Sequence, residues 1–176
     1  MSATAHATTS TQPLDLSVLR RMSFTELQTL YRAAKRPSSL SDLDGDAQGA
    51  MLAWRSPASG PLAWLLSSFG SSSVFPWKGK SFKSKFNDQG EWINRIDLGL
   101  WKTRWFPFGT RFDASFLDGE PAFVLDYSRP GNPPLIRQIV DEVREVGPGL
   151  YMGPAALTVA GKPRPILFFA LDFRTV

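Results

Sequence analysis

The chain has 176 residues, a net charge of +4 and no cysteine, and its length is typical of one domain that buries a core without disulfide bonds. The lack of cysteine excludes thiolate nucleophiles and zinc fingers, and the only histidine, His6, lies in a polar N-terminal stretch. A catalytic triad, a His-ligated haem or a two-His metal site is therefore not expected, and we predict no cofactor and no metal.

The N-terminal residues, 1–13, are small and polar and lack the basic start and apolar run of a signal peptide. We interpret them as a disordered tail, and residues 14–176 as a single β-barrel domain. The longest apolar stretches, at 61–66 and 166–171, are much shorter than a transmembrane segment. The sequence thus predicts a cytoplasmic protein with no transmembrane segment.

The first predicted element is a helix that begins at the capping box formed by Ser23 and Glu26 and ends at Pro37. Apolar residues recur at helical spacing between Phe24 and Ala34. We expect this helix to pack on the sheet or to plug it. A turn at 42–45, a strand at 50–54 and a short apolar helix at 61–69 should follow.

Beyond residue 76 the apolar pattern changes from a period of 3.6 to a period of 2, which is typical of strands. Strands are expected at residues 77–86, 92–98, 100–108, 111–117 and 122–127. The third should break at Pro107 and Gly109, and Asp118-Gly119 is a strong hairpin turn before the last. Such short connections predict an antiparallel meander.

One bulge is predicted in the first strand of this meander. Trp77 has the opposite parity to Phe82 and Phe86, and one extra residue near 79–81 restores the alternation. The three rings then face inward, and the lysines face outward. Those lysines are Lys78, Lys80, Lys83 and Lys85. A bulge that contains glycine curves a sheet, so this pattern favours closure into a barrel.

A second helix is predicted near 134–146, started by Pro134 and ended by Gly147, because the intervening apolar residues recur at helical spacing. Neighbours on a helix point about 100° apart, so Asp141 and Glu142 should lie on a solvated face and not form a catalytic pair. Strands at 150–159 and 165–173 complete the chain. The predicted fold is mainly β (α+β), an antiparallel meander closing into one lipocalin-like barrel with an N-terminal helix and an inserted helix.

The element Trp-Lys-Gly-Lys-Ser-Phe at 77–82, after a helix and before a meander, resembles the opening strand of calycin barrels, the grouping of lipocalins and fatty-acid-binding proteins. The run at 123–153 is similar to an uncharacterised group of small bacterial proteins. Lipocalins place their helix after the last barrel strands, whereas the helix predicted near 134–146 precedes two of them. The resemblance implies a cavity for hydrophobic small molecules and no reaction.

Aromatic residues are the strongest positive signal, with six Trp and 13 Phe. A single ring is more often part of a filled core, but a small barrel that holds so many indoles needs either a bulky core or space between the rings, which favours a pocket. The candidate ligand-binding residues are Trp77, Phe82, Trp92, Trp101, Trp105, Phe112 and Phe116, with Asn94 or Arg111 as a polar handle. The first hypothesis is therefore the binding of an apolar small molecule such as a lipid or isoprenoid.

The alternative hypothesis is a cofactor-independent cyclase, isomerase or lyase that acts on such a molecule. Asp126 would serve as general base, Tyr127 or Tyr151 as acid, and Arg129 as an anion clamp. In the competing structural interpretation, which we prefer, Asp126 caps the turn and pairs with Arg129.

A third hypothesis is an interaction module without a pocket, binding protein or single-stranded nucleic acid. Basic residues on the predicted strands, such as Lys102 and Arg104, fit a single-strand-binding face. Stacking platforms need rings and lysines on the same face, however, and the bulge predicted near 79–81 places them on opposite faces. We therefore expect no nucleic-acid partner.

Overall fold

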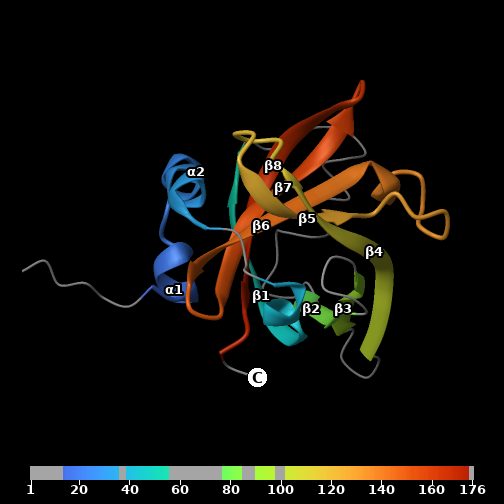
Figure 1. Cartoon of the computed structure of the whole chain (residues 1–176), viewed down its shortest axis with the longest axis horizontal. Coiled ribbons are helices and arrows are strands. Elements are labelled where there is room, and N and C mark those ends of the chain that lie inside the picture. The colour runs from blue at the N-terminus through green and yellow to red at the C-terminus, as the bar shows by residue number, and fades with distance from the viewer. Residues whose placement is uncertain (1–13, 36–38, 56–76, 85–89, 98–101, 175–176) are drawn as a thin grey trace, which may run out of the picture.

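The computed structural model describes residues 14–35, 39–55, 77–84, 90–97 and 102–174 (Figure 1). Two α-helices come first, α1 (Leu16–Leu19) and α2 (Phe24–Ala33), and two short 3-10 helices are η1 (Leu40–Leu43) and η2 (Ile136–Gln138). The strands are β1 (Gly45–Trp54), β2 (Trp77–Ser84), β3 (Gly90–Asp97), β4 (Lys102–Ala114), β5 (Pro121–Asp126), β6 (Ile139–Gly147), β7 (Leu150–Val159) and β8 (Lys162–Asp172).

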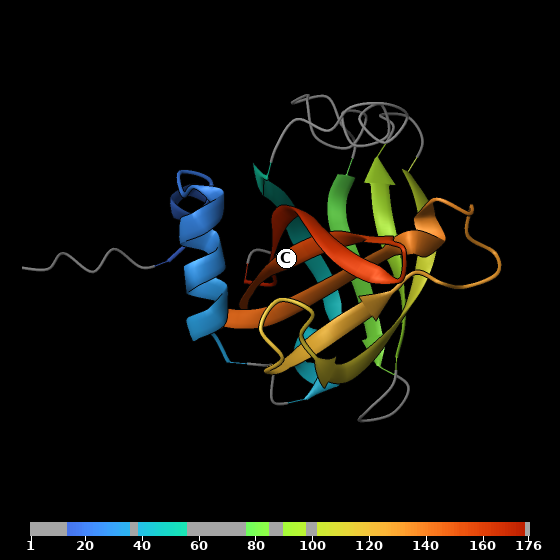
Figure 2. The ribbon, with the colours of Figure 1, turned by 90° about the horizontal axis from the view of Figure 1, so that it is seen from above.

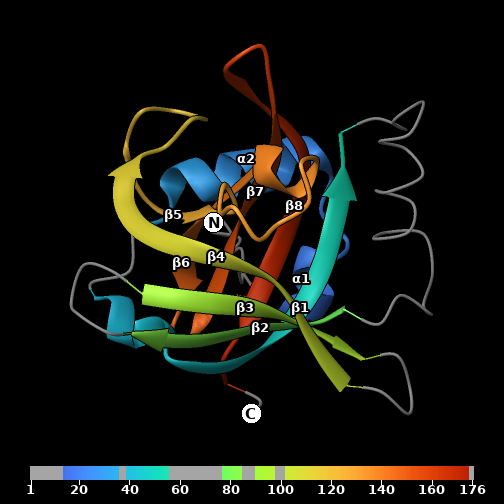
Figure 3. The same cartoon turned by 90° about the vertical axis from the view of Figure 1, so that its right-hand side faces the viewer.

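The strands pair antiparallel in chain order, and β8 returns to pair with β1, so the ladder forms a closed barrel. Figure 3 shows β2, β3 and β4 on the side of the barrel away from α2. The prediction of a mainly β, antiparallel fold with few helices is confirmed. The short helix predicted at 61–69 lies outside the described residues.

Helix α2 forms where its capping box predicts. The Ser23 side chain accepts a hydrogen bond from the backbone N–H of Glu26 at 3.3 Å, and Glu26 accepts one from the backbone N–H of Ser23 at 2.7 Å. The apolar face of the helix buries Leu27 and Tyr31. Figure 2 shows α2 lying along the outside of the sheet, so it covers the barrel and does not plug it.

The barrel separates two apolar layers, because alternate residues of a strand point to opposite faces. On β8, Phe169 belongs to the layer inside the barrel, whereas Phe168 belongs to the layer beneath the helices. The inner layer, called the interior core below, includes Ala47, Phe108, Phe123, Leu125, Tyr127, Val143, Tyr151, Leu167, Phe169 and Leu171. The outer layer includes Leu19, Leu27, Tyr31, Leu150, Met152, Phe168 and Ala170.

The predicted break at Pro107 and Gly109 is wrong, since β4 runs continuously from Lys102 to Ala114. Proline is tolerated because the register of β3 with β4 shifts between Trp92 and Asn94, which leaves Phe106 and Pro107 without paired residues there. Phe106 takes a positive φ of 58° in this bulge. Proline has no backbone N–H to donate, so this unpaired position can hold it within a continuous strand.

The predicted helix at 134–146 is also wrong, because the chain forms the short η2 and then the strand β6. On β6, Val143 packs in the interior core and Val146 packs against the outer layer. A strand buried on both faces has no polar side, so its apolar spacing does not alternate and can imitate that of a helix. The β-branched residues Ile139, Val140 and Val143 favour the strand.

Two predicted hairpins are confirmed. Asp118 and Gly119 lie in the turn between β4 and β5, where Gly119 has a φ of 78°. The connection between β7 and β8 places Gly161 at a φ of 73°, a conformation in which glycine is favoured. The predicted first strand at 50–54 is part of β1, which begins five residues earlier at Gly45.

Candidate functional site

A lysine, an aspartate and a tyrosine meet inside the barrel. Lys80 of β2 donates a hydrogen bond to Asp141 Oδ2 of β6 at 2.7 Å, and a second one to the hydroxyl of Tyr127, which follows β5. The Tyr127 hydroxyl in turn donates to Asp141 Oδ2 at 3.2 Å. We call these three residues the interior polar centre.

Aromatic rings surround the ammonium group of this centre. Lys80 Nζ lies 4.8 Å from the ring centroid of Phe108, 4.9 Å from that of Phe169 and 5.1 Å from that of Tyr127. Cations at such distances from a ring are attracted by its negative face. Lys80 is only 2% exposed and Asp141 only 5%, so the ion pair is held in an apolar, ring-lined interior.

The position of Lys80 corrects the prediction that all four lysines of its strand face outward. The register of β2 with β3 shifts between Trp77 and Gly79, before the predicted bulge at 79–81. Lys80 therefore points inward, where Asp141 and the Tyr127 hydroxyl compensate for the loss of water. The sequence carries no local sign of this, because Asp141 lies 61 residues away.

Burial and the neighbouring charge shift the pKa of Lys80 in opposite directions. Removal from water lowers the pKa of the ammonium group, and the neighbouring Asp141 carboxylate opposes that shift. The second carboxylate oxygen, Asp141 Oδ1, is also buried and has no hydrogen-bond partner among the described residues. A buried carboxylate oxygen without a donor is costly, so this atom is an acceptor to which a bound molecule could donate.

The residues of the enzymatic hypothesis are divided between two surfaces. Asp126 pairs with Arg111 at 2.9 Å on the outside of the barrel and accepts a hydrogen bond from the backbone N–H of Ser128 at 2.8 Å. Partial burial alone would raise the pKa of Asp126, but the hydrogen bonds from Ser128 and Arg111 outweigh it and lower that pKa. A carboxylate so stabilised is a weak general base, and the Ser128 contact is the turn cap predicted as its structural role.

The partner predicted for Asp126 was Arg129, a half-buried residue of the loop after β5. Arg111, predicted as an inward polar handle, is instead exposed and also pairs with Asp113 at 3.0 Å. Tyr127 and Tyr151 both lie in the interior core, and burial raises the pKa of Tyr151. The structure thus brings Tyr127 into a polar centre, but its partners there are Lys80 and Asp141 and not the predicted Asp126.

Two of the predicted ligand-binding rings have described side chains. Phe112 is half-buried and packs edge-on against Phe123 of the interior core, with ring centroids 5.4 Å apart. Phe116 lies in the turn after β4, where its backbone N–H donates to Glu142 Oε2 at 3.0 Å. The structure places the backbone of Trp77, Phe82, Trp92, Asn94 and Trp105 in β2, β3 and β4, and Trp101 lies outside the described residues.

A second polar cluster lies beneath α2, where a solvated helix face was predicted. Glu142 is fully buried, and it accepts hydrogen bonds from the Ser115 hydroxyl at 2.5 Å and from the backbone of Phe116. Burial raises the pKa of Glu142. Arg144 forms a bidentate pair with Asp118 at 2.7 and 2.8 Å. These contacts fasten the β4–β5 turn to β6, which is a structural role.

Arg144 also connects this cluster to helix α2. It donates to the backbone carbonyl of Tyr31 at 3.2 Å, and its guanidinium group lies 4.4 Å from the centre of the Tyr31 ring. A planar, charged guanidinium is suited to a bidentate pair and a ring face at the same time. The helix is therefore held to the barrel by a polar anchor as well as by the apolar outer layer.

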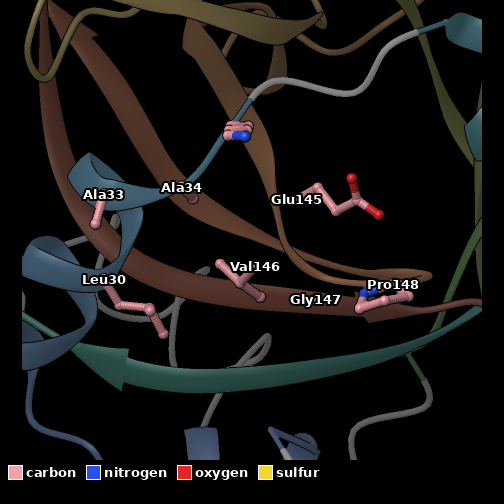
Figure 4. Close-up of a pocket in the computed structure, with 8 residues that line it drawn as sticks. Leu30, Ala33, Ala34, Glu145, Val146, Gly147 and Pro148 are labelled. Carbon is pink, nitrogen blue, oxygen red and sulfur yellow. The ribbon is translucent and has the colours of Figure 1, made fainter.

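A groove of about 320 Å³ lies on the surface between the end of α2 and the end of β6 (Figure 4). Leu30 and Ala33 line it from the helix, and Glu145, Val146 and Pro148 line it from the strand and the residue that follows. The groove is outside the barrel and shares no residue with the interior polar centre.

In the part of the chain that the structure describes, no three carboxylate or histidine side chains converge as a metal site. None of the helices described is long and apolar enough to cross a membrane.

No family model matches the chain, and no curated protein matches it. A crystal structure of a protein from Thermomonospora curvata is similar in fold, with a TM-score of 0.52 and 19% sequence identity. The similarity covers 85% of this chain and 86% of that protein. It extends over most of both chains and shows a shared fold.

Proposed function

We propose that this protein binds an apolar small molecule, such as a lipid or an isoprenoid, inside a lipocalin-like barrel, with the interior polar centre holding the polar end of the ligand. The observation that carries the proposal is the Lys80–Asp141 ion pair, which is buried among Phe108, Tyr127 and Phe169. Apolar walls with a few convergent polar groups are the usual composition of a small-molecule site.

The energetics of a buried ion pair support a functional role. Removing two charges from water offsets most of their mutual attraction, so apolar residues of similar volume often give equal or greater stability. An interior that needed only to be filled would gain little from Lys80 and Asp141. A polar group aimed at a ligand explains why charge is placed at the centre of an aromatic interior.

The test combines two measurements on the purified protein. Native mass spectrometry should show a co-purified apolar molecule, and decanol or farnesol added in excess should raise the melting temperature by mass action. As a control, Lys162→Met removes an exposed lysine and should leave the rise in melting temperature unchanged. No adduct, together with no thermal shift for any apolar compound, would overturn the proposal.

A second candidate is a cofactor-independent isomerase, lyase or cyclase in the same interior. The position of the Tyr127 hydroxyl favours it, since this group is hydrogen-bonded to both the Lys80 ammonium and the Asp141 carboxylate and general acid–base catalysis needs such positioned proton donors and acceptors. Tyr127→Phe separates the candidates. A carrier should convert no ligand either before or after this substitution, whereas an enzyme should lose its turnover of the bound molecule.

A further inference from the structure

The interior polar centre has one spare acceptor and one spare donor. Asp141 uses Oδ2 for Lys80 and Tyr127, whereas Oδ1 has no partner among the described residues. An ammonium group has three N–H donors, and Lys80 directs two of them to Asp141 and Tyr127. For the third there is no oxygen acceptor in the part of the chain that is described.

We propose that the ligand carries a hydroxyl group, which accepts a hydrogen bond from Lys80 and donates one to Asp141 Oδ1. The proposal rests on the proposed function and names the ligand class as apolar alcohols. A hydroxyl group suits this position because one oxygen atom both donates and accepts. Its apolar remainder would lie against the rings of Phe108 and Phe169, which already flank Lys80.

Other polar ends match the centre less well. A carboxylate would satisfy Lys80 but bring a second anion beside Asp141, and like charges in an apolar interior repel strongly. An amine would satisfy Asp141 but add a cation beside Lys80. An ether accepts from Lys80 and donates nothing, so Asp141 Oδ1 would stay without a donor at the cost of a buried unsatisfied group.

The test compares decanol with methyl nonyl ether, which have the same atoms and nearly the same length and differ in the donor. Affinities are measured by equilibrium dialysis against the full-length protein. A hydrogen bond to a charged group discriminates by about tenfold or more, so decanol should bind at least about tenfold more tightly than the ether. Lys162→Met should keep this ratio.

The double variant Lys80→Met/Asp141→Leu removes the charges together and leaves no unpaired ion. It should bind both compounds with similar affinity. Equal affinities in the unmodified protein would overturn the alcohol proposal while leaving the proposed function in place. Binding of neither compound, together with no co-purified molecule and no thermal shift for any apolar compound, would overturn both. The ratio in the unmodified protein decides the matter even if the double variant does not fold.

Discussion

Lys80 and Asp141 form an ion pair of 2.7 Å across the interior of the barrel, although their strands, β2 and β6, are not neighbours in the sheet. The pair therefore joins two walls that the backbone ladder connects only through the intervening strands. The Tyr127 hydroxyl completes this link from the end of β5. The polar centre proposed to hold a ligand is thus also a tertiary contact of the fold.

Removing one partner of this ion pair should cost more stability than removing both partners together. Lys80→Met leaves the Asp141 carboxylate buried without its cation, which should lower the free energy of unfolding by about 3–5 kcal/mol. Lys80→Met/Asp141→Leu should be close to the unmodified protein in stability or above it. Urea unfolding followed by far-ultraviolet circular dichroism measures both. Equal midpoints for the single and the double variant would contradict this prediction.

Arg144 should be a larger determinant of stability than its sequence position indicates. Its guanidinium group is 1% exposed and pairs with Asp118 while also donating to the Tyr31 carbonyl. Arg144→Met should therefore destabilise by about 3–5 kcal/mol, because it leaves Asp118 and several carbonyls without their donor. Lys in this position keeps the charge but not the bidentate geometry, so Arg144→Lys should recover only part of the loss. The melting temperatures measure this, and they should fall in the order unmodified protein, Arg144→Lys, Arg144→Met.

Gly153 should not tolerate a side chain. A Cβ built at this position would lie 1.6 Å from the backbone oxygen of Glu142 on the neighbouring strand, so alanine would force β6 and β7 apart. We expect Gly153→Ala to cost more than the roughly 1–3 kcal/mol typical of an overpacked site. Gly131→Ala, where nothing lies within 4 Å, is the control and should change stability by less than about 0.5 kcal/mol. Comparable midpoints for the two variants would refute this.

Glu142 should make the stability of the protein depend on pH. Burial raises its folded-state pKa above the ordinary value of 4.5, so the folded state retains this proton to a higher pH than the unfolded state. Its contribution to stability is greatest below pH 4.5 and falls as the pH rises through the folded-state pKa. The loss is about 1.4 kcal/mol for each unit of the shift.

The measurement for Glu142 is the difference in unfolding free energy between the unmodified protein and Glu142→Gln, from about pH 4 to about pH 8. The glutamine side chain does not ionise there, so any fixed loss of its contacts shifts the difference equally at every pH. The difference should move in favour of the variant as the pH rises. A difference that is constant over this range would show that the Glu142 pKa is not raised.

Local signals in the sequence predicted the local features of the fold. The capping box at Ser23 and Glu26 predicted α2, and Asp118-Gly119 predicted the β4–β5 turn, since each acts over only a few residues. Strand β6 was mistaken for a helix because both of its faces are buried, one in the interior core and the other under α2. That covering depends on tertiary packing, which periodicity does not show.

The candidate site was predicted only in outline. An aromatic interior and a role for Tyr127 were expected from the sequence, but Lys80 was placed on the outer face. The register shift lies between Trp77 and Gly79 and not at 79–81, so Lys80 has the opposite direction to the one predicted. Asp141 was assigned to a solvated face with the mistaken helix, so the pairing of two residues so distant in sequence was not recognised.

The location of a bound apolar molecule tests the proposed function most directly, because the proposal places the molecule inside the barrel and the surface groove is the alternative place. Decanol is added to the protein, and nuclear Overhauser contacts between its chain and assigned protein protons are recorded. Binding inside the barrel predicts contacts to the rings of Phe108, Tyr127 and Phe169, which surround Lys80. Contacts confined to Leu30, Ala33 and Val146 would place the ligand in the surface groove and contradict binding inside the barrel.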